Sequence, residues 1–231
     1  MNRDELKRQA AEYAAQFVES GMVVGLGTGS TAIWAARKIG AWLQEGTLTD
    51  IIGIPTSVGT ADEARQLGIP LSTLEEHPAI DVTIDGADEV DPDLNLIKGG
   101  GGALLREKIV AQVTARQIIV VDEAKLSERL GMQWGVPVEV VPFGWSGQKT
   151  FLESLGADVV VRQTQAGAVY HTDQGNLILD CNFGMIDDAV GLGLRLIQRA
   201  GIVEHGLFIG LTSDVIVARP NGIEHQKHPE M

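Results

Sequence analysis

Three loops of the sequence combine glycines with side chains that could bind or transform a phosphorylated ligand. In the first, Gly25-Leu26-Gly27-Thr28-Gly29-Ser30-Thr31, glycines permit close approach of the backbone and hydroxyls precede a helical segment. The N–H groups and dipole of a helix N-terminus favour a phosphate there. The pattern is not the dinucleotide fingerprint, because Ser30 occupies the third glycine position, and it lacks the Gly-Lys-Ser/Thr of a Walker A loop. The plainer alternative is a turn that uses glycine for positive φ and Ser or Thr as a cap.

The second loop, residues 85–95, is densely acidic and follows a short apolar run. Carboxylates packed this closely repel one another and raise one another's pKa, so we expect them either to have a functional role or to be paired with a positive charge. For Asp85 and Asp88, at the mouth of the predicted strand, we expect a catalytic or hydroxyl-binding role. For the other acidic side chains we expect a solvated turn: Glu89, Asp91 and Asp93.

A calcium-binding loop is an alternative for this acidic segment. Asp91, Asp93 and Asn95 fit the first, third and fifth positions of an EF-hand. The sixth position is Leu96 rather than Gly, and the twelfth is Gly102 rather than Glu. We therefore reject calcium, and the scattered histidines and single cysteine predict no other metal site.

The third loop runs from Lys98 through four consecutive glycines into a helical pattern that contains Glu107. Consecutive glycines lose much backbone entropy on ordering, so we expect them where the backbone wraps a ligand or bends sharply. Lys98 supplies a cation at the edge of this loop. Glu107 could reach the same ligand, or it could be a surface carboxylate paired with a neighbouring Lys or Arg, and spacing alone leaves both roles open.

The elements that position these loops alternate between short apolar runs and helical patterns. Residues 3–19 have apolar side chains at helical spacing and stop at Ser20-Gly21. Strand and helix then recur at 22–26 and 31–43, 51–54 and 58–67, and 80–84 and 103–113, with a further strand at 117–121. We expect a mostly parallel sheet with helices on both faces, a Rossmann-like α/β fold whose ligands bind beyond the carboxyl ends of the strands.

After about residue 131 the pattern changes to that of a smaller α+β domain. Strands are expected at 136–141, 158–163, 168–171 and 176–181, and helices at 149–155 and 186–199. The runs 207–211 and 215–218 are expected to return to the first sheet, and the tail from Gly222 to be frayed. The predicted domains are therefore a catalytic α/β domain, residues 1–131 with 203–231, and a smaller domain, residues 132–202.

Composition narrows the class of protein. The formal net charge of −13 disfavours nucleic acid or anionic lipid as the main partner, although a local cationic pocket stays open. No apolar run approaches the roughly 20 residues that span a bilayer, and the charged N-terminus lacks the apolar core of a signal peptide, so we expect a cytoplasmic protein. Cys181, the only cysteine, excludes an internal disulfide and is expected to be a small buried side chain.

Four segments in register closely resemble the type A family of ribose-5-phosphate isomerases. They are GLGTGSTA at 25–32, DGADEVD at 85–91, KGGGGALLREK at 98–108 and VDEAK at 121–125, and PVEVVPF at 137–143 extends the match. The resemblance implies interconversion of ribose 5-phosphate and ribulose 5-phosphate in the pentose phosphate pathway of carbohydrate metabolism. It also implies an enzyme without metal or organic cofactor, in a homodimer or homotetramer.

The resemblance also assigns residues. It makes Glu107 the proton acceptor, and the chemistry of such an isomerisation gives Asp85, Asp88 and Lys98 as further catalytic groups. It implies substrate binding by Lys7, Thr28, Gly29, Ser30, Thr31, Asp85, Gly86, Ala87, Asp88, Lys98, Gly99, Gly100, Gly101 and Lys125. An enediolate mechanism needs such a base, a cation for the oxyanion and carboxyls for hydroxyl protons. One departure is Ala124, which stands where the family commonly has a hydroxyl residue.

Two other classes of function compete with an isomerase. A sugar-phosphate sensor domain would keep the binding loops without catalysis, but no basic helix-turn-helix segment accompanies them and Glu107 is retained. A nicotinamide-dependent dehydrogenase is weakened by the missing third glycine at Ser30.

Overall fold

A computed structural model describes residues 3–228, which form two compact units. Of the described residues, unit 1 comprises 3–87, 106–125 and 211–228, and unit 2 comprises 88–105 and 126–210. These limits differ from the predicted domains, because residues 88–105, 126–131 and 203–210 lie in unit 2. The domain limits at residues 131 and 203 therefore stay a prediction, namely that the segments on either side of them fold as separate domains.

Unit 1 contains a six-stranded sheet with the order β13-β12-β6-β3-β1-β2. Its strands are β1 (Val23–Leu26), β2 (Ile52–Pro55), β3 (Ile80–Gly86), β6 (Thr114–Asp122), β12 (Asp214–Arg219) and β13 (Gly222–Lys227). Each pair of neighbours from β12 to β2 is parallel, and β13 alone is antiparallel. The predicted mostly parallel sheet is therefore confirmed.

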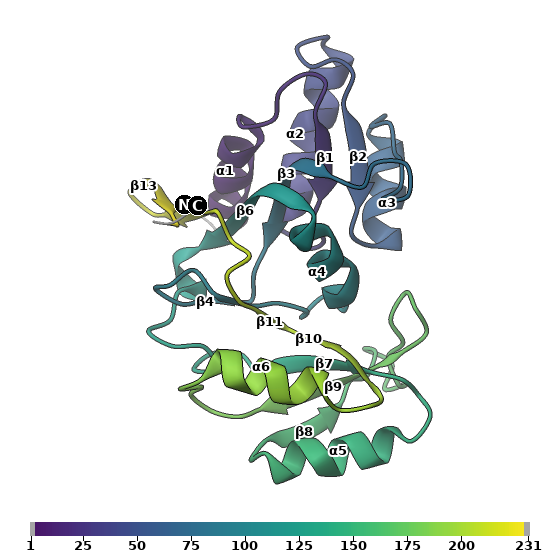
Figure 1. The fold of residues 1–231 in the computed structure, drawn as a ribbon. Helices are drawn as coiled ribbons and strands as arrows, with labels where there is room; N and C mark the ends of the chain where they lie inside the picture. The colour runs from purple at the N-terminus through teal and green to yellow at the C-terminus, as the bar shows by residue number, and fades with distance from the viewer. Residues whose placement is uncertain (1–2, 229–231) are drawn as a thin grey trace. The chain divides into compact units, whose positions relative to one another are not determined.

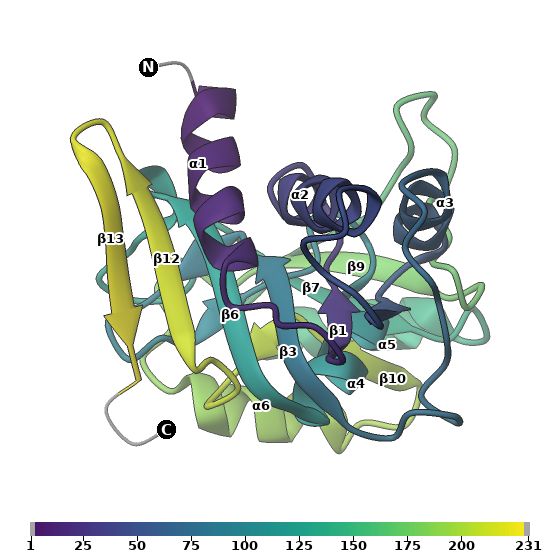
Figure 2. The ribbon, with the colours of Figure 1, turned by 90° about the horizontal axis from the view of Figure 1, so that it is seen from above.

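Helices cover both faces of this sheet. They are α1 (Arg3–Ala15), α2 (Ala32–Gln44), α3 (Val58–Gln66) and α4 (Leu104–Gln112), whose first two residues belong to unit 2. Figure 2 shows α1, α2 and α3 on the same side of the strands, where their alanines and Ile39 pack on side chains such as Val82 and Ile118. Val110 of α4 packs against Ile54 and Ile80 in a separate cluster. Burial on both faces explains why these strands are near-continuous apolar runs in the sequence.

Unit 2 contains a four-stranded antiparallel sheet with the order β10-β7-β9-β8 and a three-stranded sheet with the order β11-β5-β4. The elements are β4 (Glu89–Val90), β5 (Leu96–Ile97), β7 (Val136–Val140), α5 (Trp145–Ser154), β8 (Asp158–Val161), β9 (Leu177–Asn182), α6 (Ala189–Ile197), β10 (Ile202–His205) and β11 (Leu207–Phe208). Figure 1 labels all of these elements except β5. A short 3-10 turn, η1 (Glu123–Lys125), ends the middle segment of unit 1.

One face of the four-stranded sheet forms the core of unit 2. Leu177, Leu179 and Cys181 on β9 point into a cluster that includes Leu152 of α5 and Leu196 of α6. Successive side chains of a strand point to opposite faces, so Ile178 and Asp180 lie on the other face of β9. Over residues 3–228, no helix has the length and apolar character needed to cross a membrane.

Several segments differ from the prediction. Residues 222–227 are not frayed but form the edge strand β13, and the prediction for 229–231 lies outside the described residues. Residues 168–171 form no strand, only an isolated bridge between Gln163 and Val169. Of the two runs expected to return to the first sheet, 215–218 does so within β12, whereas Leu207–Phe208 pairs with β5.

Candidate active site

The carboxyl ends of the parallel strands β1, β3 and β6 carry the first predicted loop, the start of the acidic loop and the segment that contains Lys125. The first loop follows β1, Asp85 and Gly86 end β3, and η1 with Lys125 follows β6. Ligands of open parallel sheets bind at this edge, where loops and helix N-termini converge. Unit 1 therefore gathers the first half of the candidate site.

Gly27 lets the first loop lie directly against Asp85. A Cβ atom at Gly27 would stand 2.3 Å from the Asp85 Oδ1 atom and 2.6 Å from its Cα atom. Asp85 is fully buried, and its Oδ1 accepts hydrogen bonds from the backbone N–H groups of Thr28 at 3.2 Å and Gly86 at 2.8 Å. The carboxylate thus fixes the path of both loops, and Gly27 is required by the close approach of Asp85 rather than by a positive φ.

A cluster of hydroxyls surrounds Thr28, and the sequence analysis missed it. The Thr28 Oγ1 atom lies 2.8 Å from Thr56 Oγ1, 2.9 Å from Ser57 Oγ and 3.0 Å from Thr60 Oγ1. Ser57 also caps α3 by accepting from the Thr60 N–H at 3.0 Å. The signal was present in the sequence, because Pro55-Thr56-Ser57 ends the strand that neighbours β1, and adjacent parallel strands end at the same edge.

The first loop borders a cavity of about 330 Å³ in unit 1. Its lining comprises Gly27, Thr28, Gly29, Ser30, Ile33, Arg37, Ser57, Gly59, Thr60 and Glu63. The Lys7 ammonium donates to Ser30 Oγ at 3.1 Å, so a cation from α1 stands at the loop. Thr31 is the N-cap residue of α2, yet its side chain makes no capping hydrogen bond, so capping does not explain this hydroxyl. Hydroxyls, a lysine and a helix N-terminus together suit a phosphate group.

Glu107 is buried, with only 5 % of its surface exposed, in the first turn of α4. The alternative of a surface helix carboxylate is therefore wrong. Lys125 is half-buried at the end of η1. In the same turn the Ala124 N–H donates to the carboxylate Oδ1 of Asp122 at 3.1 Å, a hydrogen bond that does not depend on a hydroxyl at position 124.

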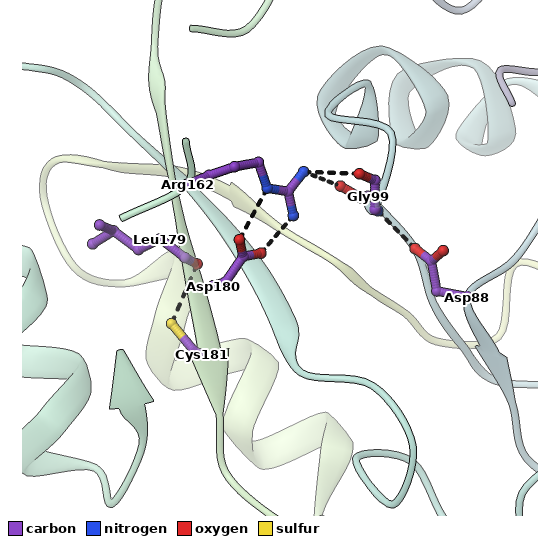
Figure 3. Close-up of polar contacts among 7 residues, drawn as sticks. Asp88, Gly99, Arg162, Leu179, Asp180 and Cys181 are labelled. Carbon is purple, nitrogen blue, oxygen red and sulfur yellow. Dashed lines mark hydrogen bonds and ion pairs between the residues drawn. The ribbon is translucent and has the colours of Figure 1, made fainter. Parts of the chain in front are cut away.

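Unit 2 holds Asp88, Lys98 and the predicted glycines 99–101, whereas Ala87 ends the first segment of unit 1. The Gly100 N–H donates to Asp88 Oδ2 at 2.7 Å, which ties the glycine loop to the acidic loop (Figure 3). Lys98 is buried, its N–H donates to the Gly206 carbonyl at 2.8 Å, and its ammonium lies 5.6 Å from the centre of the Phe208 ring. The structure thus places the cation predicted for the oxyanion inside unit 2 rather than on its surface.

The prediction of a solvated acidic turn is wrong for Glu89. This side chain is fully buried and accepts hydrogen bonds from four backbone N–H groups, those of Gly131, Met132, Gln133 and Trp134, at 3.0 to 3.1 Å. It holds the 131–134 loop to β4.

Asp91 is half-buried, and its Oδ1 accepts from the N–H groups of Asp93 and Asn95, so it organises the turn instead of merely being solvated. Burial raises the pKa of Asp91, while the hydrogen bonds from Asn95 oppose that rise. Asp93 is exposed, as predicted.

Cys181 is fully buried in the core of unit 2, which confirms the prediction of a small buried side chain. Burial raises the pKa of its thiol, so it does not act as a nucleophile at neutral pH. Among residues 3–228, no group of three or more His, Cys, Asp or Glu side chains is arranged to hold a metal ion. Two larger hollows in unit 2, of about 570 and 600 Å³, contain none of the predicted site residues.

The predicted site is divided between the units. Unit 1 brings the first loop together with Lys7 and Asp85, and unit 2 brings Asp88 together with the glycine loop.

Comparison with known proteins shows the family to which the chain belongs. The sequence pattern of a family described as ribose 5-phosphate isomerase A (phosphoriboisomerase A) matches residues 52–222. The ribose-5-phosphate isomerase A of Desulfatibacillum aliphaticivorans is 61% identical over 226 residues, which cover 98% of each chain. That of Chloroflexus aurantiacus is 55% identical over 219 residues, covering 95% of this chain and 92% of the relative.

Solved structures give the same result. A D-ribose-5-phosphate isomerase in complex with phospho-erythronic acid matches with a TM-score of 0.96 at 39% identity, over 98% of this chain and 100% of the other. The ribose 5-phosphate isomerase of Plasmodium falciparum matches with a TM-score of 0.94 at 40% identity, over 97% and 98% of the two chains. The chain therefore belongs to the ribose 5-phosphate isomerase A family.

Proposed function

We propose that this protein interconverts D-ribose 5-phosphate and D-ribulose 5-phosphate through an enediolate, as an aldose-ketose isomerase of the pentose phosphate pathway. The observation that carries the proposal is the hydrogen bond between the Thr28 N–H and Asp85. It joins a loop suited to phosphate to a buried carboxylate suited to sugar hydroxyls, within one unit. The relative solved with phospho-erythronic acid, a phosphorylated sugar acid, supports a ligand of this class.

The phosphate of the substrate serves as the binding handle in this proposal. Ser30, Thr31 and the N-terminal N–H groups of α2 take its oxygens, and Lys7 and Lys125 supply positive charge. Such local charge is needed because a net charge of −13 repels an anionic substrate. Binding energy from the phosphate then orients the reacting carbons.

Glu107 is the general base in this proposal. Its carboxylate removes the proton from C2 of the aldose and returns it to C1, so that the electron pair of the broken C–H bond forms the enediolate and then the ketose. Burial of Glu107 suits this role, because a water-poor site strengthens its interaction with the substrate. Lys98 stabilises the oxyanion, and Asp85 and Asp88 bind the hydroxyls and move their protons.

An assay of ribose 5-phosphate conversion by the purified protein in the presence of EDTA tests this function. We expect full activity, because the proposed steps use only side chains and the acidic loop lacks the calcium pattern. Activity that is lost on chelation and restored by Mg²⁺ or Mn²⁺ would contradict the metal-free mechanism. Binding of ribose 5-phosphate without turnover would favour a sugar-phosphate sensor, and NAD binding in a fluorescence titration would favour a dehydrogenase.

Thr31→Ala and Lys125→Ala test the phosphate site. Both variants should weaken binding of a phosphorylated pentose analogue and leave binding of ribose itself unchanged. Thr150→Ala and Lys149→Ala, on the surface helix α5, are matched controls that should change neither. Unchanged affinity for the phosphorylated analogue in both site variants would show that the phosphate binds elsewhere.

Location and assembly are further proposals. We propose a cytoplasmic location, in keeping with a sugar-phosphate isomerase as the proposed function. We also propose a homodimer or homotetramer, which the resemblance supports, without nucleic acid or membrane partners. Light scattering of the purified protein measures the assembly directly.

A further inference from the structure

Arg162 connects the sheet of unit 2 to the glycine loop. It directly follows β8, and its side chain is 14% exposed. Its guanidinium pairs with both carboxylate oxygens of Asp180, from Nε to Oδ2 at 3.0 Å and from Nη2 to Oδ1 at 2.5 Å. Its Nη1 donates to the carbonyls of Gly99 at 2.7 Å and Gly100 at 3.2 Å. Figure 3 shows the guanidinium between the Asp180 carboxylate and this backbone.

The peptide groups of the loop are thereby fixed from two directions. The Gly100 N–H donates to Asp88 Oδ2 at 2.7 Å, while its carbonyl accepts from Arg162. Tyr170 adds a steric contact, because a Cβ atom at Gly102 would lie 2.2 Å from the Tyr170 hydroxyl oxygen. Arg162 and Tyr170 are themselves joined, since the Tyr170 N–H donates to the Arg162 carbonyl at 2.9 Å. One irregular hairpin therefore contacts both ends of the four-glycine run.

Such restraint is needed because consecutive glycines have the most conformational freedom to lose. Gly99 and Gly102 also adopt φ values of +107° and +81°, which the restrained loop must maintain. The planar fork of an arginine can satisfy a carboxylate and backbone carbonyls together, whereas the compact ammonium of a lysine cannot reproduce this geometry.

We propose that Arg162, held by Asp180, is a positioning residue that sets the glycine loop for catalysis. This inference rests on the proposed function, in which Lys98 and the loop bind the reacting end of the sugar. Arg162 acts on the loop through its backbone carbonyls. A small displacement of a reacting group can reduce turnover by about a hundredfold, so the loss of this restraint should appear mainly in kcat.

Arg162→Ala and Arg162→Lys test the proposal, with kcat, KM and inhibition by inorganic phosphate as readouts. For Arg162→Ala we expect kcat to fall by about tenfold to a hundredfold while inhibition by phosphate is unchanged, because the proposed phosphate loop belongs to unit 1. Arg162→Lys should recover little. Arg129→Ala, which removes an exposed ion pair with Asp187 in the same unit, is the control and should leave kcat unchanged.

Chemical rescue separates positioning from support of the fold. Millimolar guanidinium chloride should restore part of the kcat of Arg162→Ala by occupying the vacated place beside Asp180, and should not stimulate the wild type or Arg129→Ala. A folded Arg162→Ala protein with wild-type kcat, or with reduced kcat that guanidinium does not raise, would overturn the proposal. If Arg162→Ala does not fold, Asp180→Asn keeps the shape and weakens the pair, and an unchanged kcat in that variant would equally overturn it.

Lys98→Ala distinguishes this inference from the proposed function. Lys98 is assigned to the substrate itself, so its loss should abolish most turnover without response to guanidinium. Full activity of Lys98→Ala would contradict the proposed site. Loss of activity in Lys98→Ala together with full activity in Arg162→Ala would contradict only the positioning role.

Discussion

Glu89→Gln exchanges one carboxylate oxygen for an amide NH₂ inside a group of four backbone donors. In the wild type, Oε2 accepts from Gly131 and Trp134, and Oε1 accepts from Met132 and Gln133. Whichever way the glutamine amide turns, two N–H groups face another donor. The two remaining hydrogen bonds lose their charged acceptor.

The number of bonds sets the size of the effect. Hydrogen bonds to charged groups contribute about 1.5–3 kcal/mol each, so losing two predicts a destabilisation of at least about 3 kcal/mol. That is a large part of the roughly 5–15 kcal/mol by which a folded protein is stable. For a chain of this size it corresponds to a fall in Tm of about 6–12 °C.

Urea denaturation and thermal unfolding of Glu89→Gln measure the effect. Hydrogen exchange adds a local readout, because the amides of Met132 and Gln133 should lose protection. Asp93→Asn is the matched control from the same acidic loop, since Asp93 is exposed, and it should change stability by less than about 0.5 kcal/mol. A loss of less than about 1 kcal/mol in Glu89→Gln would refute the view that these four bonds anchor the 131–134 loop.

Three further predictions follow from buried contacts. Gly27→Ala should destabilise the protein by about 1–3 kcal/mol and reduce activity, because the new Cβ would stand 2.3 Å from Asp85 Oδ1. Gly147→Ala, on the open face of α5, should instead stabilise it by about 0.5–1 kcal/mol. Urea titrations that rank the two variants in the opposite order would contradict this prediction. Burial alone would raise the pKa of Asp214, but hydrogen bonds from Arg116 and His225 outweigh burial and lower this pKa below its ordinary value. The ionised carboxylate therefore stabilises the fold, and this stabilisation is lost as the pH falls through the folded-state pKa. Asp214→Asn should make the free energy of unfolding fall less steeply toward acidic pH, and an unchanged acid dependence would contradict the prediction. Burial raises the pKa of Glu139 above its ordinary value, so ionisation of this carboxyl destabilises the fold as the pH rises. Glu139→Gln should therefore have a higher Tm than the wild type near neutral pH but not below about pH 4. A gain in Tm that does not depend on pH would contradict this explanation.

The parallel sheet could be predicted because its strands are buried on both faces and read as short apolar runs between helices. The edge strand β13 could not, since Glu224, Gln226 and Lys227 give it the composition of a solvated tail. Its pairing with β12 depends on a long-range contact that no local pattern reports.

The candidate site, like the fold, could be predicted only in part from the sequence. The glycine loops and the acidic loop could be predicted from the sequence, because runs of glycine and dense carboxylates destabilise a fold and indicate a functional role. The burial of Glu89 could not, because the donors that compensate it lie 42 to 45 residues further along the chain. Arg162 gave no local signal either, since its partners are Asp180 and the backbone of Gly99 and Gly100, 18 to 63 residues away.

The central claim is that Glu107 is the base of the isomerisation, and Glu107→Gln tests it most directly. Glutamine keeps the shape of the side chain and removes the basic carboxylate. Turnover of ribose 5-phosphate should fall by about 10²–10⁴-fold while KM changes little, and exchange of the C2 proton with deuterium from the solvent should be lost in parallel. A folded Glu107→Gln protein that retains more than about a tenth of wild-type turnover and still exchanges the C2 proton would contradict the claim, and the base would then be sought at Asp85 or Asp88.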